Sequence, residues 1–121
     1  MSKYKQREQT FFVLYQTLLK GYLDKEDYEN LPKEFRYVLA IIFDQKDELI
    51  ELINDQLNQW TFDRLGYIEQ AILLLACGEV IALQTPKQVV INESVEYAKK
   101  YGEEDTTYKL INATLDKVLD V

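Results

Sequence analysis

Residues 68–83 read IEQAILLLACGEVIAL, and the rest of the chain is best understood from this stretch outward. Apolar side chains would cover every face of a helix here, which is typical of a helix at the centre of a fold, so we expect a helix from about Ile68 to Leu83. By apolarity alone it can serve either as a core or as an interface. Gly78 within it costs about 1 kcal/mol relative to alanine unless a neighbour needs the space.

On the N-terminal side, helical periodicity continues and strand alternation is almost absent. Ser2 is a candidate N-cap and Gly21 a candidate stop for the first helix, whose apolar face holds Phe11, Leu14, Tyr15, Leu18 and Leu19. Residues 24–30 predict a short helix or turn, and Pro32 can occupy the first turn of the next helix. A polar break at 44–47 leaves either two helices or one kinked helix before residue 58.

On the C-terminal side, Thr85 and Gln88 have the spacing of a capping box that would open another helix, which Gly102 would end. Asp105 or Thr106 can cap the last helix. About seven helices joined by short loops predict an all-α fold. A length of 121 residues favours a single domain over residues 1–121, with helical halves of about 1–58 and 59–121.

The charge of the chain is unevenly distributed. The formal net charge is −7, yet residues 1–20 carry a balance of +3 and the remainder −10. An acidic body with a basic N-terminal tip suits a protein that contacts RNA at one edge and a basic protein elsewhere. The simpler interpretation is that an acidic surface only maintains solubility.

Several classes of function are disfavoured by the composition. The sequence has no histidine, no glycine-rich phosphate loop and one cysteine, Cys77, on the most apolar helix, so we expect no catalytic site, no metal site and no cofactor. The adjacent acids Glu103, Glu104 and Asp105 favour the N-terminus of a helix rather than a metal. No run reaches the roughly 20 apolar residues of a membrane span and no secretory signal is visible, so we expect a cytoplasmic protein.

Ordered motifs extend over residues 60–117. They begin with Trp60, Arg64-Leu65, I-E-x-A-I-L at 68–73 and Glu79, and they continue with P-x-x-V-x-I-N-E-x-V-E-x-A-K-x-Y-G at 86–102 and N-x-x-L-D-K at 112–117. Arg7-Glu8 followed by Leu14-Tyr15 adds a match at the N-terminus. In this order and spacing the sequence resembles the NusB family of bacterial transcription antitermination factors. The resemblance implies two three-helix bundles packed perpendicularly.

The family resemblance also implies a function. NusB proteins pair with the small ribosomal protein NusE, and the pair binds single-stranded boxA RNA within the RNA polymerase antitermination complex, chiefly in ribosomal RNA transcription. Relatives include monomers and homodimers. By this resemblance the candidate RNA-binding residues are Lys3, Lys5, Arg7, Tyr15, Asp105 and Lys109, and the candidate protein-partner residues are Asp63 and Glu69.

Two departures from the family pattern predict weak RNA binding without the partner. The usual N-terminal arginine cluster is reduced to Lys3, Lys5 and Arg7, and Leu110 replaces an aromatic residue that could stack on a base. For Tyr15, core packing is as good an interpretation as RNA contact, and for Glu69 so is stabilisation of a helix N-terminus. We expect the cations of the first helix to share one positive surface with Lys109.

Two alternative functions follow from the same features. The first is a NusB-like protein-interaction module that has lost RNA affinity. The small number of basic residues at the N-terminus and the net charge of −7 favour it. The second is a detached RNA-targeting domain of an RNA methyltransferase, since some of these enzymes carry a NusB-like domain. A chain that ends at Val121 without a catalytic domain argues against this second alternative.

Overall fold

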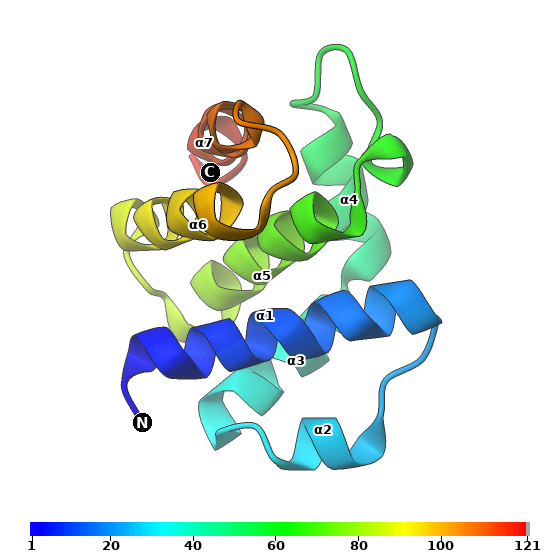
Figure 1. Cartoon of the computed structure of the whole chain (residues 1–121), viewed down its shortest axis with the longest axis vertical. Helices are drawn as coiled ribbons and strands as arrows, with labels where there is room; N and C mark the ends of the chain where they lie inside the picture. The colour runs from blue at the N-terminus through cyan, green and yellow to red at the C-terminus, as the bar shows by residue number, and fades with distance from the viewer. Residues whose placement is uncertain (121) are drawn as a thin grey trace.

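A computed structural model describes residues 1–120, and over this range the chain folds into seven α-helices and one 3-10 helix, with no strand (Figure 1). The helices are α1 (Lys3–Lys20), α2 (Lys25–Glu29), α3 (Lys33–Asp44), α4 (Lys46–Asn54), α5 (Tyr67–Leu83), α6 (Lys87–Tyr101) and α7 (Thr107–Val118), with the 3-10 helix η1 (Phe62–Arg64) before α5. The predicted all-α fold is confirmed.

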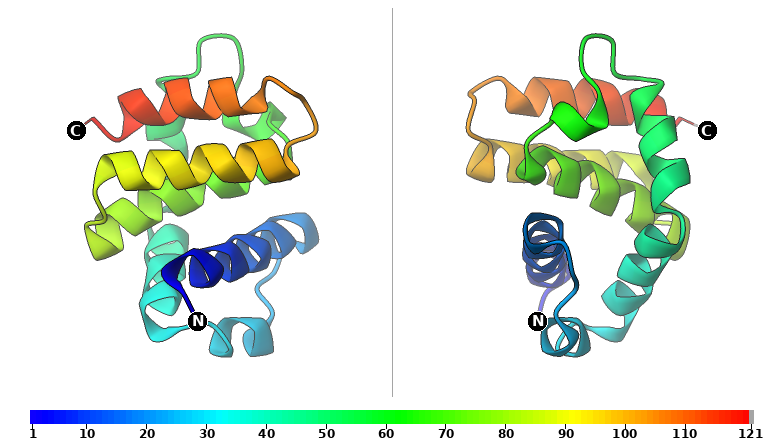
Figure 2. Two further views of the ribbon diagram at one scale, coloured as in Figure 1. Left: turned by 60° about the vertical axis from the view of Figure 1, so that its left-hand side comes forward. Right: turned by 90° about the vertical axis from the view of Figure 1, so that its right-hand side faces the viewer.

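Helix α5 forms the centre of the molecule. Every residue from Gln70 to Glu79 is buried, and α5 packs against α1, α3 and α4 as well as α6 and α7. Figure 2 shows α6 and α7 side by side next to α5, with α1 along its other side. The middle of this stretch, residues 70–79, therefore forms core, whereas Ile81 near its end is exposed. Across residues 1–120, no helix is both long enough and apolar enough to cross a membrane.

Gly78 lies where α3 crosses α5. A Cβ atom built on Gly78 would lie 2.5 Å from Cγ1 of Ile42 and 3.2 Å from Cγ1 of Val38. Such a distance is well inside van der Waals contact, so the glycine allows α3 to approach the backbone of α5 closely. The unfavourable helix propensity of Gly78 is thus offset by packing between two elements.

The helix ends agree only in part with the predicted signals. Ser2 caps α1 by accepting a hydrogen bond from the backbone N–H of Lys5, and Gly21 ends α1 with φ of 88°, as predicted. The polar break separates two helices, because α3 ends at Asp44 and α4 begins at Lys46.

The predicted capping box at Thr85 is wrong. Pro86 takes the N-cap position of α6, so the hydroxyl of Thr85 lies one residue too early and no side chain caps the helix. Thr106 stands at the N-cap of α7, but it also makes no capping hydrogen bond through its side chain.

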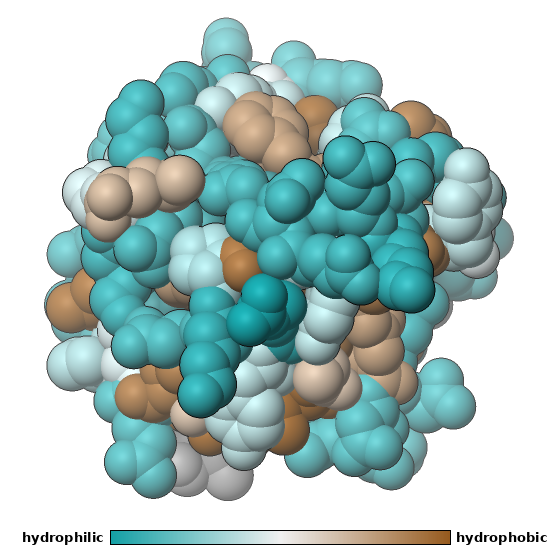
Figure 3. All heavy atoms as spheres, turned by 90° about the horizontal axis from the view of Figure 1, so that it is seen from below, coloured by the Kyte–Doolittle hydropathy of each residue, from teal (hydrophilic) through white to brown (hydrophobic). Residues whose placement is uncertain are grey.

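The surface on the side of α1 and α2 is mostly hydrophilic. Figure 3 shows separate apolar side chains among polar ones on this side rather than one continuous apolar patch. Phe12 and Leu19 of α1 and Tyr37 of α3 are among the large hydrophobic residues exposed to solvent. Isolated apolar side chains are normal on a protein surface, so each needs its own argument before a role is assigned.

Candidate nucleic-acid interface

Arg7 lies on the side of α1 that faces α5, where it forms a buried ion pair. Its Nε donates to Oε1 of Glu79 at 2.6 Å and its Nη2 donates to Oε2 at 2.7 Å, with side-chain exposures of 6% for Arg7 and 1% for Glu79. The Nη1 atom lies 3.8 Å from the carboxylate of Glu93 on α6. Burial is the largest single influence and opposes the charge of Arg7, but the hydrogen bonds to Glu79 and the negative charges of Glu79 and Glu93 together outweigh it and raise the pKa of the guanidinium.

The expectation that Arg7 contacts RNA phosphates therefore needs correction. A carboxylate buried within the apolar helix α5 needs a cationic partner, and the guanidinium supplies it. Sequence reasoning missed this pair, although Glu79 within an otherwise apolar run was a signal that some cation must face it. Arg7 instead fixes α1 against α5 and α6.

Lys3 and Lys5 point to different surroundings. The Nζ of Lys3 donates to Glu34 of α3 at 2.6 Å and lies 5.8 Å from the ring centroid of Phe35. Lys5 is exposed and makes no ion pair within the described part of the chain. The structure thus does not bring the three cations of α1 together on one positive surface with Lys109, because Arg7 is buried against Glu79 and Lys3 pairs with Glu34, which leaves only Lys5 exposed and free of an ion pair.

Two lysines at the end of α6 face different helices, Lys100 facing α1 and Lys99 facing α7. The Nζ of Lys100 donates to Oε2 of Glu8 at 2.9 Å, and the hydroxyl of Tyr101 donates to the same oxygen at 2.6 Å. The hydrogen bond from Tyr101 is the largest cause of a lowered pKa for Glu8, followed by that from Lys100, so this carboxyl remains ionised. Lys99 of α6 lies 5.0 Å from the ring centroid of Tyr108 on α7.

We call Lys5, Lys99, Lys100 and Lys109 the lysine edge. Its residues come from α1, α6 and α7, and all four are exposed. Lys5 lies one turn before Glu8 on α1, and Lys109 directly follows Tyr108 on α7. Sequence reasoning missed Lys99 and Lys100 as surface cations because only the folded chain brings the end of α6 to α1.

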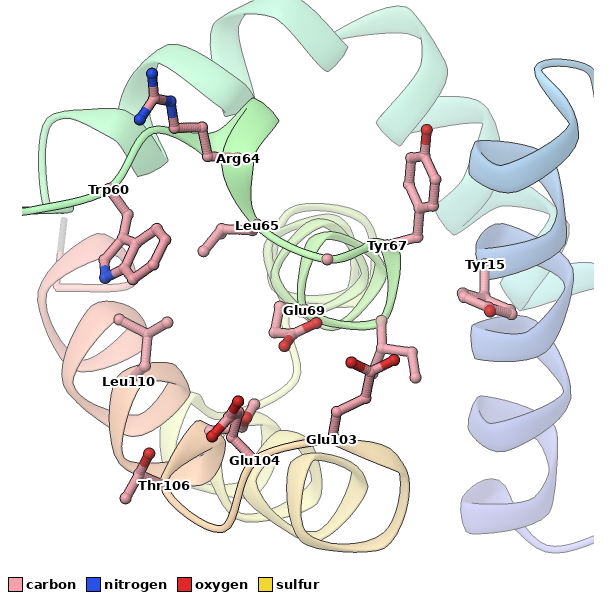
Figure 4. Close-up of a pocket in the computed structure, with 13 residues that line it drawn as sticks. Tyr15, Trp60, Arg64, Leu65, Tyr67, Glu69, Glu103, Glu104, Thr106 and Leu110 are labelled. Atoms are coloured by element: carbon pink, nitrogen blue, oxygen red, sulfur yellow. The ribbon is translucent and has the colours of Figure 1, made fainter.

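A groove of about 730 Å³ lies between the second half of α1, η1, the start of α5 and the turn between α6 and α7 (Figure 4). Its walls carry the carboxylates of Glu69, Glu103 and Glu104 and a single cation, Arg64, whose guanidinium points away from them. Aromatic and apolar side chains complete the walls, namely Tyr15, Trp60, Leu65, Tyr67, Ile68 and Leu110.

The groove brings together two candidates that had been assigned to different partners. Tyr15, predicted as an RNA contact, is half-buried, lines the groove and stacks on Phe11 at a centroid distance of 6.5 Å. Glu69, predicted as a protein contact, lines the same groove. Asp63 is exposed on η1, where its carboxylate accepts a hydrogen bond from Thr61. Asp105 is exposed in the turn between α6 and α7, beside Glu104.

The groove and the lysine edge carry opposite charges, negative in the groove and positive along the edge. Three carboxylates repel a phosphate backbone and attract a cationic ligand, whereas exposed lysines do the reverse. Aromatic side chains beside the acids offer apolar contact area to the same ligand. Within residues 1–120, no three Cys, Asp or Glu side chains are placed to hold a metal ion. The groove is thus suited to a basic protein segment.

Comparison with known proteins gives the family. A sequence profile of the NusB family matches residues 4–120. The chain belongs to the NusB family. The transcription antitermination protein NusB of Staphylococcus epidermidis strain RP62A is 33% identical over 130 residues, which cover 99% of this chain and 100% of that protein.

Solved structures of NusB proteins have the same fold. NusB of T. maritima superimposes with a TM-score of 0.81 at 25% identity, covering 98% of this chain and 90% of that one. A chain from a crystal structure of the antitermination factors NusB and NusE in complex with dsRNA gives a TM-score of 0.70 at 26% identity, covering 98% and 97% of the two chains. The likeness to NusB therefore includes both α1 and the C-terminal helices.

Proposed function

We propose that this NusB-family protein is a non-enzymatic, cytoplasmic transcription antitermination factor. It binds boxA-like single-stranded RNA together with the ribosomal protein NusE, within the RNA polymerase antitermination complex that supports ribosomal RNA transcription. The observation that carries the proposal is the separation of an acidic, aromatic groove from a lysine edge on neighbouring helices. Family membership and the solved complex of a related NusB with NusE and RNA support it.

The acidic groove is the proposed site for NusE. Carboxylates at an interface steer a basic partner and set its register more than they add affinity, and this role fits Glu69 with Asp63 close to the groove. Tyr15 and Trp60 provide aromatic area of the kind that dominates binding energy in interfaces. We therefore move Tyr15 from the proposed RNA contacts to the proposed protein contacts.

The lysine edge is the proposed site for RNA. Lys5 and Lys109 remain proposed phosphate contacts, joined by Lys99 and Lys100. Lys3 is a peripheral contact, because an exposed ion pair such as that with Glu34 is weak enough for a phosphate to displace it. Asp105 lies one turn before Lys109 and remains a proposed contact through its carboxylate oxygens.

The test is a titration of boxA RNA, with and without NusE, at several salt concentrations. We expect weak binding by the protein alone and tighter binding with NusE, whose own cations add to the lysine edge. Removing one phosphate-binding lysine, as in Lys5→Ala or Lys109→Ala, should reduce the slope of log K against log salt by about 0.7.

Lys25→Ala is the matched control, since Lys25 is an exposed lysine on α2 whose one ion pair within residues 1–120 is with Glu29. An affinity and a salt slope that are the same in Lys5→Ala, Lys109→Ala and the unmodified protein would rule out this RNA site.

A protein-interaction module with little RNA affinity is the second candidate function. The net charge of −7 and the ion pair between Lys100 and Glu8 favour it, because they reduce the positive potential available to phosphates. The same titration separates the two functions. A module of this kind would bind NusE without any gain in RNA affinity over NusE alone.

A further inference from the structure

A small hollow lies between α1 and α2, apart from the acidic groove. Its volume is about 280 Å³, and its walls are formed by Gln9, Phe12, Val13, Gln16, Asp27 and Asn30. No residue lines both the hollow and the groove. Small-molecule sites usually enclose about 300–1,000 Å³, so a hollow of this size suits a single side chain rather than a whole cofactor.

Phe12 forms the aromatic wall of the hollow. It is 42% exposed, whereas its neighbour Phe11 is buried and anchors α1 in the core. Figure 2 shows α2 and α6 on opposite sides of α1. The ring of Phe12 meets the ring of Tyr101 on α6 edge-on, with centroids 5.1 Å apart, and it also lines the hollow next to α2. Tyr101 supports the ring, and an exposed aromatic face attracts cations.

Asp27 gives the hollow its charge. It is partly buried, and within residues 1–120 no other charged side chain lines the hollow. Its carboxylate forms no ion pair with any cation of this range. Lys5 and Lys20 of α1 lie outside the hollow, and Lys20 is 5.3 Å from the ring centroid of Tyr22. An unpaired carboxylate beside an aromatic ring favours a cation and repels a phosphate.

Gln9 adds a hydrogen-bond acceptor at the junction of the two helices. Its Nε2 donates to the backbone oxygen of Asn30 at 3.5 Å, which joins α1 to the end of α2. Its Oε1 is buried and accepts no hydrogen bond from residues 1–120. Buried polar atoms normally have a partner, so a donor that enters between α1 and α2 would complete the hydrogen bonding of Gln9.

We propose that the hollow binds an arginine side chain of a basic protein partner. The guanidinium stacks on Phe12, pairs with Asp27 and donates a further N–H to Gln9. It can make these contacts together because it is planar and carries five donors, whereas the ammonium of a lysine is a compact charge that cannot stack.

An arginine held in a polypeptide fits better than a free amino acid. No lysine or arginine of residues 1–120 lines the hollow, so the carboxylate of free arginine would have no cation to pair with. The net charge of −7 attracts a basic protein to the surface as a whole. This inference concerns a contact outside the acidic groove and the lysine edge, and it does not depend on RNA binding.

The probe for this site is N-acetyl-arginine amide, titrated at millimolar concentrations into the intact protein while NMR records the backbone amide shifts. We expect saturable shifts at Gln9, Phe12 and Asp27. Asp27→Asn should weaken binding by about threefold to fivefold, the range of an exposed ion pair. Phe12→Leu should weaken it by about threefold, because leucine retains apolar bulk but no ring. N-acetyl-citrulline amide, which has nearly the same shape without the charge, should give no saturable shift.

Glu26→Gln is the matched control, because Glu26 shares the first turn of α2 with Asp27 but is exposed and does not line the hollow. Equal weakening by Glu26→Gln and Asp27→Asn would overturn the site, since attraction to an acidic protein would then explain the binding. Shifts confined to the groove around Glu69 and Glu103 would overturn it while leaving the proposed function intact. Equal binding of the citrulline probe would overturn recognition by charge, and tighter binding of free arginine would overturn the protein partner.

Discussion

Arg7 and Glu79 show how one buried carboxylate determines the role of a distant cation. When only one member of a buried ion pair is removed, the other is left as an uncompensated charge, which costs about 3–5 kcal/mol. We expect Glu79→Gln to lower the free energy of unfolding by an amount in this range, measured by denaturant unfolding. Glu93→Gln should cost less, since Glu93 is partly exposed and lies 3.8 Å from Arg7.

Replacing both Arg7 and Glu79 by apolar residues tests the role of the ion pair more directly than the single substitution does. Arg7→Met combined with Glu79→Leu leaves neither member of the pair as an uncompensated charge, and only the partly exposed Glu93 loses its cationic neighbour. The double variant should therefore recover most of the stability that Glu79→Gln removes. A double variant as unstable as the single one would show that the pair contributes through something other than mutual charge compensation.

Glu8 couples stability to pH. Its pKa is lowered in the folded protein, so the stabilisation is present above the ordinary pKa of a glutamate and disappears as pH falls through the lowered value. Glu8→Gln should therefore be less stable than the unmodified protein at neutral pH, and the difference should shrink as the pH falls below the ordinary pKa of a glutamate. Thermal unfolding over this pH range checks the prediction. Glu26→Gln, an exposed acid on α2, is the control and should give parallel curves.

At the scale of helices, the crossing of α3 and α5 depends on Gly78. Gly78→Ala would place a methyl group against Ile42, and overpacking of this kind typically costs about 1–3 kcal/mol. Denaturant unfolding measures the decrease in stability. Ile42→Ala in the same chain should remove the clash, so the double variant should be more stable than the sum of the two single changes predicts. Simple additivity would contradict a direct clash.

The end of a helix can be predicted from the sequence where a single residue is enough to mark it. Gly21 ends α1 because its φ is positive, and Ser2 caps α1 with its own hydroxyl. The sequence could not decide whether residues 44–47 break one helix or separate two, because a polar stretch fits either a kink or a gap. The misplaced cap at Thr85 arose because a proline after the hydroxyl residue itself occupies the N-cap position.

Over the whole molecule, the sequence predicts that basic and acidic residues are unevenly distributed. It does not predict which surfaces of the folded protein are basic and which are acidic. The basic balance of residues 1–20 indicated a cationic region, but a periodic pattern does not say which side of α1 meets an acid in the core, so Arg7 was misplaced. The groove combines Tyr15, Glu69 and Glu103 from three distant parts of the chain. Only the tertiary structure places them together, and the same holds for Lys100 beside Glu8.

Charge at the groove should control how fast NusE binds. The triple variant Glu69→Gln, Glu103→Gln and Glu104→Gln removes all three negative charges from the groove. At low salt, NusE should associate with it roughly tenfold more slowly than with the unmodified protein, and the dissociation rate should change less. The difference should shrink at high salt, where exposed charges are screened. Stopped-flow or surface-binding kinetics measure both rates.

The control for this triple change is Glu26→Gln, Glu48→Gln and Glu51→Gln, which removes three exposed acids from α2 and α4. If both triple variants associate with NusE equally slowly, then the net charge of the protein, rather than the groove, steers NusE.

The pair of Arg7 and Glu79 joins positions 72 residues apart, so it also bears on the order of events during synthesis. Helix α1 leaves the ribosome long before α5 has been translated, and until then its apolar side has no surface to cover it. We expect a nascent chain halted near residue 60 to remain sensitive to proteases. Resistance should arise in one step once α5 has emerged, because both halves of the fold pack on α5.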